Sequence, residues 1–127
     1  MSKLILVVDD DIDVVESRKI ILEHNNFDVI TATNIEVAWE LLEKHPVDLI
    51  ILDVMMKKDS DGFNFAQKMK ADSRYSSIPV ILATAVNQRT KFKFDPNEDG
   101  DFLPIEKFME KPIDPDDLIM AIRGLLK

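Results

Sequence analysis

The chain has 127 residues, of which 46% are hydrophobic, and its 24 acidic and 16 basic side chains give a formal net charge of −8. This length supports one compact domain, and the many apolar side chains are enough for a core, which excludes a disordered acidic tail. Lys and Arg are scattered among a larger number of carboxylates, so we expect no direct nucleic-acid partner. The absence of Cys excludes disulfides and thiolate sites.

The first apolar run, Leu4–Val8, has five residues and ends in three aspartates. It is too short for a signal peptide or a membrane span, so we expect a cytoplasmic protein without membrane insertion. Its unbroken apolar character is typical of a strand covered on both faces in a parallel sheet. Residues 12–24 then predict a helix, with apolar side chains at mostly helical spacing: Ile12, Val15, Ile20 and Leu22.

The next segments repeat this strand-then-helix pattern. Phe27–Ala32 predicts a second strand, and Thr33–Glu36 fits a capping box that opens a helix closed by Pro46. Val47–Leu52 is the most hydrophobic run and predicts a central strand that ends at Asp53. A loop is expected from 54 to 62.

The second half continues the alternation with one exception. The predicted elements are a helix over Phe63–Ala71, strands over Val80–Ala83 and Lys107–Glu110, and a last helix capped by Asp114. Residues 87–104 predict an irregular loop where a fourth helix is expected, because period-two alternation is followed by Pro and Gly breaks. The whole pattern predicts a single α/β domain over 1–127, with a doubly wound parallel sheet.

Polar residues that could act on a ligand follow several of these strands. In an open parallel sheet, ligands bind beyond the carboxyl ends of the strands. Those ends carry Asp9, Asp10, Asp53, Thr84 and Lys111. If the first and third strands are neighbours, the side chains of Asp10 and Asp53 converge. Because two carboxylates this close repel each other, either the pKa of one of them rises or a cation binds between them. Because these side chains offer only oxygen atoms to a metal, with no His or Cys among them, the expected cation is Mg²⁺.

This set of residues predicts an aspartate that accepts a phosphoryl group. A carboxylate is a competent nucleophile toward phosphorus, and aspartyl phosphate is a known covalent intermediate. Lys111 supplies positive charge and Thr84 a hydroxyl donor for the transferring oxygens, which is most of what phosphoryl transfer demands.

The sequence resembles the receiver domain of two-component response regulators (the CheY-like superfamily) over nearly the whole chain. The matching motifs run in the family's order: VVDD at Val7–Asp10, LILDVMM around Asp53, DGF at Asp61–Phe63, ILAT ending in Thr84, and KPID at Lys111–Asp114. The resemblance implies a flavodoxin-like five-stranded parallel sheet with strand order 2-1-3-4-5.

The resemblance also implies roles for individual residues. Asp53 would be phosphorylated, with Mg²⁺ held by Asp10, Asp53 and the main-chain oxygen of Met55, and with Asp9 acting mainly through water. Lys111 would pair with the phosphoryl group, and the Lys111–Pro112 bond could be cis. Thr84 would swing toward the phosphoryl group, and Phe108 would change burial when it does.

Two segments depart from the family pattern. Lys57–Ser60 stands where members usually show a shorter Pro-Gly turn, and residues 87–104 are longer than the usual fourth-helix segment. The loop beside the metal and the face that commonly signals output are therefore expected to differ.

We expect a stand-alone response regulator, not a conventional enzyme, which a histidine kinase or phosphotransfer protein phosphorylates on Asp53 and which signals to a downstream protein effector. Met55 and Val86 lie where they can crowd the water that attacks the phosphoryl group, which predicts a long-lived phosphoprotein.

One alternative is a docking module of the same fold that is never phosphorylated. A second alternative is a small aspartyl-phosphate phosphatase. Such enzymes need a second carboxylate two residues after the nucleophile, but the residue at that position after Asp53 is Met55. A flavin mononucleotide carrier shares this topology, but its phosphate-binding loop after the first strand would need small and hydroxyl residues, and this sequence has aspartates there.

Overall fold

The computed structural model describes residues 3–53, 61–84, 107–110 and 113–126, except for the side chains of residues 53, 61–64, 84, 107, 108 and 110. Strands and helices alternate along the chain. Their bounds are β1 Leu4–Val8, α1 Ile12–His24, β2 Asp28–Ala32, α2 Ile35–Lys44, β3 Leu49–Asp53, α3 Asp61–Ala71, β4 Val80–Thr84, β5 Lys107–Glu110 and α5 Pro115–Leu125.

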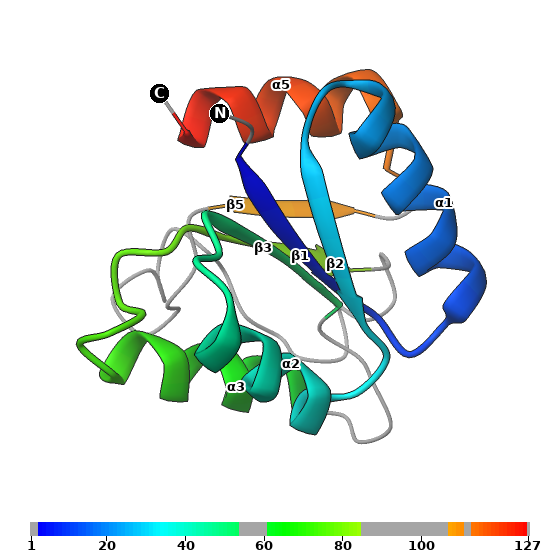
Figure 1. The fold of residues 1–127 in the computed structure, drawn as a ribbon. Coiled ribbons are helices and arrows are strands. Elements are labelled where there is room, and N and C mark those ends of the chain that lie inside the picture. The colour runs from blue at the N-terminus through cyan, green and yellow to red at the C-terminus, as the bar shows by residue number, and fades with distance from the viewer. Residues whose placement is uncertain (1–2, 54–60, 85–106, 111–112, 127) are drawn as a thin grey trace.

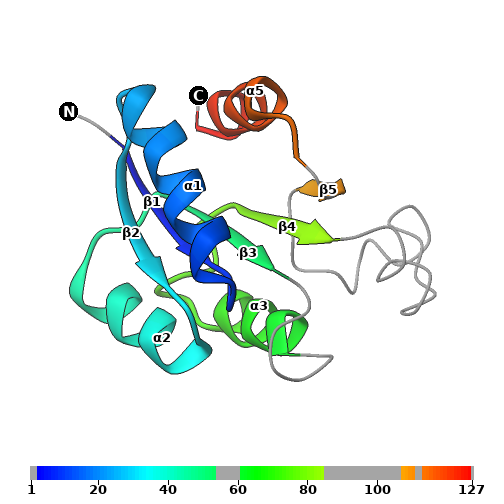
Figure 2. The same ribbon diagram turned by 90° about the vertical axis from the view of Figure 1, so that its right-hand side faces the viewer.

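The strands form one parallel sheet in the order β2-β1-β3-β4-β5. Helices α1 and α5 cover one face of the sheet, and α2 and α3 cover the other (Figures 1 and 2). The doubly wound, flavodoxin-like architecture and the order 2-1-3-4 are therefore confirmed. Within the described residues, no helix is long and apolar enough to cross a bilayer.

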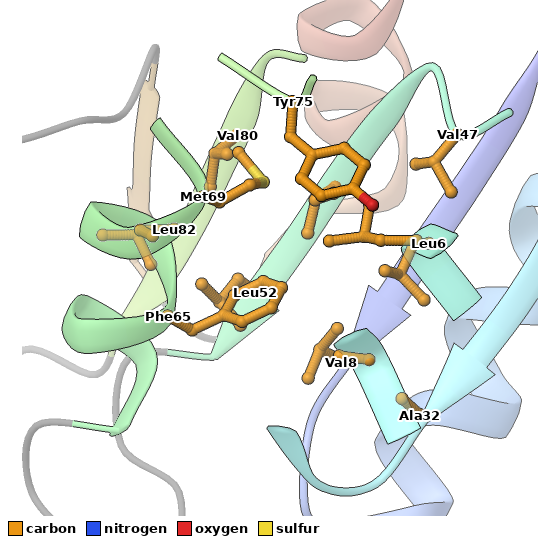
Figure 3. Packing of buried hydrophobic residues seen from close by; sticks show 14 residues of the cluster. Leu6, Val8, Ala32, Val47, Leu52, Phe65, Met69, Tyr75, Val80 and Leu82 are labelled. Atoms are coloured by element: carbon orange, nitrogen blue, oxygen red, sulfur yellow. The ribbon is translucent and has the colours of Figure 1, made fainter. Parts of the chain in front are cut away.

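Side chains that alternate along the strands divide the core into two layers. The layer under α2 and α3, shown in Figure 3, contains Leu6, Val8, Ile50, Leu52, Val80, Leu82, Phe65 and Met69. The layer under α1 and α5 contains Ile5, Val7, Leu49, Ile51, Ile81, Val15, Leu22, Leu118 and Ile122. Because both faces of β1, β3 and β4 are covered, these strands are apolar at consecutive positions instead of alternating with polar ones.

The predicted elements exist, with small shifts at their ends. Helix α1 has the predicted bounds, whereas β3 begins at Leu49 instead of Val47 and α3 begins at Asp61 instead of Phe63. Element ends are set by a few local hydrogen bonds, so periodicity locates them only to within a few residues. The irregular loop predicted for residues 87–104 lies outside the described residues.

The capping box predicted at Thr33–Glu36 is wrong. The helix begins one residue later, where the Asn34 side chain accepts a hydrogen bond from the Val37 backbone N–H at 2.8 Å. With Asn34 as the N-cap, Glu36 stands at the second helical position and not at the third, so the reciprocal bond of a capping box is not available to it. Glu36 still lies in the first turn, where its charge is favourable to the helix dipole.

The apolar face of α1 also differs from the predicted one. Val15 and Leu22 are buried, but Ile12 and Ile20 are 61% and 66% exposed, and the third buried position of the helix is Arg18. Residues 15, 18 and 22 follow the three- and four-residue spacing of one helix face, whereas position 20 points away from it.

Aspartates cap the helices that cover one face of the sheet. The Asp11 side chain accepts a hydrogen bond from the Asp13 N–H at 2.9 Å at the start of α1. Asp114 accepts bonds from the Asp116 and Asp117 N–H groups at 2.9 and 3.3 Å at the start of α5, where Pro115 occupies the first helical position. Each cap satisfies backbone donors that the helix itself leaves unpaired.

The cap at Asp11 yields a stability prediction. Asp11→Ala is expected to lower the free energy of unfolding by about 1 kcal/mol, because the first turn of α1 loses its acceptor. Asp11→Ser is the matched control, since it removes the same negative charge but keeps an acceptor, and it should retain most of the stability. Urea unfolding followed by circular dichroism measures both variants. Equal losses in the two variants would contradict a capping role.

Candidate functional site

The register of the sheet brings together the acidic residues that follow β1 and the aspartate that ends β3, at the carboxyl ends of the strands. This end of the sheet is called its edge below. Val8 of β1 lies across from Leu52 of β3, so Asp9 follows at the position across from Asp53. Asp53 is paired in turn with Ala83 of β4, next to Thr84. Neighbouring strands lie about 4.8 Å apart, so the backbones at Asp9 and Asp53 are adjacent. The ends of β1 and β3 are therefore adjacent, whereas the predicted convergence of the Asp10 and Asp53 side chains stays a prediction, because the side chain of Asp53 lies outside the described residues.

Asp9 is held rigidly at this edge. It is fully buried, and its backbone N–H donates to the Ala32 carbonyl at 3.1 Å, which extends the pairing of β1 with β2 by one bond. Its Oδ1 accepts a hydrogen bond from the Asp11 N–H at 3.0 Å. Its Oδ2 lies 3.6 Å from a guanidinium nitrogen of Arg18. Asp10, the next residue, is exposed. The pair therefore consists of an inner carboxylate fixed by the protein and an outer one open to solvent.

Arg18 is the residue near this edge that sequence reasoning missed. It is 8% exposed and, among the described residues, Asp9 and Arg18 are the buried charged side chains. A single Arg in an acidic, polar-faced helix looks like a solvated charge in the sequence. The available signal was its position three residues after Val15 and four before Leu22, which places it on the buried face of α1.

Arg18 also lines a groove between α1 and the start of α5. The groove has a volume of about 510 Å³ and is lined by Asp13, Val14, Ser17, Arg18, Ile21, Ile113, Pro115 and Leu118. The same side chain that lines this groove therefore also lies 3.6 Å from the carboxylate of Asp9.

The remaining predicted site residues are placed only in part. Thr84 ends β4 and is paired with Glu110, and Phe108 lies in β5 across from Leu82, but the side chains of Thr84 and Phe108 are outside the described residues. Met55, Lys111 and the Lys111–Pro112 bond are outside them altogether. Their proposed roles stay predictions.

The described donors fit a hard cation. Asp9 and Asp10 offer carboxylate oxygens at the edge where β3 ends, and such donors suit Mg²⁺ rather than a soft metal. Within the described side chains, which do not include that of Asp53, no three acidic or imidazole groups come together around a common point. The two carboxylates that follow β1 would thus supply part of a magnesium site that needs Asp53 to complete it.

Comparison with known proteins assigns a family to this arrangement. Residues 5–123 match the response regulator receiver domain. The chain is 37% identical over 123 residues to the response regulator Rre1 of Synechocystis, covering 96% of this chain and 51% of that protein. It is 32% identical over 127 residues to the response regulator GtcR of Aneurinibacillus migulanus, covering 100% of this chain and 49% of that protein. This chain thus spans about half the length of these relatives, and others are named as transcriptional regulators.

A solved structure agrees with the family match. The chemotaxis response regulator CheY4 of Vibrio cholerae superposes with a TM-score of 0.83 at 25% identity, covering 99% of this chain and 100% of that chain. The likeness therefore extends over the whole layered fold and includes the edge at which β1 and β3 end. The chain belongs to the response regulator receiver domain family, whose members are signalling modules of two-component systems.

Proposed function

We propose that this chain is a phosphoryl-accepting receiver in which Asp53 is the phosphoacceptor and Mg²⁺ is the cofactor. The proposal rests on one observation above all: the parallel register of β1 with β3 brings Asp9 and Asp10 to the strand end that carries Asp53. Family membership and the order of the acidic, hydroxyl and lysine motifs along the chain support it.

The reaction is a transfer of one phosphoryl group between two residues. An oxygen of the Asp53 carboxylate attacks phosphorus, a new O–P bond forms, and the P–N bond to the imidazole of a donor histidine breaks. Bound Mg²⁺ would neutralise charge on the transferring oxygens and would be held by Asp10, Asp53 and the Met55 carbonyl, with Asp9 acting mainly through water.

The chain's own residues would complete the charge balance. Lys111 pairs with the phosphoryl oxygens in the product, and the Thr84 hydroxyl turns to donate to one of them. The movement of Thr84 shifts an equilibrium between two conformations, which Phe108 reports through its burial. A partner protein binds one conformation better than the other and so detects phosphorylation.

This function requires a phosphoryl donor and a protein that responds to phosphorylation. A histidine kinase or a histidine phosphotransfer protein supplies the phosphoryl group, and a downstream protein effector reads the result in the cytoplasm. Direct nucleic-acid contact by this domain is not proposed, since its net charge is −8 and its basic residues are scattered.

The phosphoacceptor is tested by intact mass after incubation with Mg²⁺ and acetyl phosphate. The wild-type protein is expected to gain about 80 Da, the mass of one phosphoryl group, and Asp53→Ala should gain nothing because the nucleophile is gone. A chelator should abolish the gain in the wild type. Asp28→Ala is the matched control and should behave as wild type. It removes an exposed carboxylate at the start of β2, at the amino ends of the strands and therefore away from Asp53.

The outcome separates the proposal from its rivals. A wild-type protein that binds Mg²⁺ but gains no mass would favour a docking module that is never phosphorylated. An equal gain in Asp53→Ala would move the phosphoacceptor to another residue.

A second prediction concerns the lifetime of the phosphoryl group. Met55 and Val86 lie two residues after Asp53 and Thr84 in the sequence, and as an apolar pair they should hinder the attacking water. Met55→Asn is therefore expected to shorten the lifetime of the phosphoprotein several-fold, measured as the rate at which the added mass is lost. Met120→Asn, at an exposed position of α5, is the control. Fast hydrolysis in the wild type that Met55→Asn leaves unchanged would refute the idea.

A further inference from the structure

Arg18 lies on the buried face of α1, at a position where an apolar side chain is expected. With Val15 and Leu22 it forms the buried face of α1, which packs on the sheet beside α5. An aliphatic side chain would fill such a position without desolvating a charge, whereas a buried guanidinium is tolerated only when an anion compensates it.

The compensating anion is the inner carboxylate of the proposed magnesium site. Arg18 approaches Oδ2 of Asp9 to 3.6 Å, while Oδ1 accepts a backbone hydrogen bond from Asp11. Asp9 is fully buried and the Arg18 side chain is 9% exposed, so water screens this pair weakly. The positive charge is therefore a built-in neighbour of the carboxylates at the edge of the sheet.

We propose that Arg18 is a resident counter-cation that weakens Mg²⁺ binding and stabilises the metal-free protein; this inference rests on the proposed function. The carboxylates of Asp9, Asp10 and Asp53 attract cations, and Arg18 offsets one unit of their negative charge from a fixed position beside Asp9. A divalent cation that enters would lie beside Asp9, which acts on it mainly through water, and would be repelled by the fixed charge of Arg18. Arg18 acts through Asp9, so it is a positioning residue that sets metal affinity and not a metal ligand.

Arg18 should also affect the stability of the metal-free protein. Without Arg18, the buried carboxylate of Asp9 loses a neutralising partner, and the metal-free protein should become less stable. Mg²⁺ would then take over that role. Binding to the folded state alone stabilises it by RT ln(1 + [L]/Kd), so at a given Mg²⁺ concentration the rise in Tm above the metal-free value should be larger for such a variant.

The test is calorimetric titration of the full chain with MgCl₂, together with melting curves at increasing Mg²⁺. Arg18→Met removes the charge but keeps an unbranched side chain of similar length against the α1–α5 groove. We expect Mg²⁺ to bind this variant at least about tenfold more tightly than wild type, because removing one unit charge roughly 6 Å from a dication changes its affinity by about that factor even with the screening of bulk water. Its Tm should rise with Mg²⁺ more than the wild-type Tm does.

Two further variants make the comparison specific. Lys19→Met removes the same charge from the adjacent, half-buried position of α1 and should leave the Mg²⁺ affinity near the wild-type value. Arg18→Gln is a second neutral variant with a polar end, and it should reproduce the gain of Arg18→Met. If either variant folds only when Mg²⁺ is present, circular dichroism will detect that dependence, and it would support the inference.

Other outcomes would overturn the inference. Unchanged or weaker Mg²⁺ binding in the Arg18 variants would do so, as would an equal gain in Lys19→Met, since that gain would reflect net charge. Failure of both Arg18 variants to fold even with Mg²⁺ would assign Arg18 a purely structural role. The proposed function is judged separately, on whether the wild type binds Mg²⁺ and gains a phosphoryl group.

Discussion

The parallel pairing of β1 with β3 is the constraint on which the rest of the molecule depends. In this register Val8 lies across from Leu52, so both strands leave the core at the same level and their acidic residues follow together. The same pairing requires both sheet faces to be covered, because consecutive residues of these strands point to opposite layers of the core. Helices α1 and α5 on one side and α2 and α3 on the other meet that requirement (Figure 1).

The buried charge at the edge of the sheet is costly, and this cost explains the environment of Asp9. Burial of a carboxylate is costly unless hydrogen bonds and a nearby cation compensate its charge. The backbone of Asp11 supplies a hydrogen bond, and Arg18 supplies the cation from the second turn of α1. Replacing both partners of such a pair by apolar side chains would cost little stability, but removing Arg18 alone leaves the carboxylate of Asp9 without its compensating charge.

Much of the fold could be predicted from local patterns in the sequence. Unbroken apolar runs identified β1 and β4, and the Asp114-Pro115 pair located the start of α5, because these signals depend on neighbouring residues alone. The errors arose where similar local signals compete. Thr33 and Asn34 can both cap a helix, and the structure uses Asn34. Ile20 and Arg18 lie on different faces of α1, and hydrophobicity alone favoured Ile20 for the core, although the sheet covers the face that holds Arg18.

The sequence by itself determined that the chain is an α/β domain with acidic residues after its first and third apolar runs. This follows because periodicity and strand ends are properties of short segments. Only the tertiary structure decided that Asp9, not Asp10, is the buried carboxylate and that Arg18 lies beside it. Their contact depends on how α1 rotates and packs over the end of β1, which is set by the fit of the whole helical face against the sheet and by no single residue.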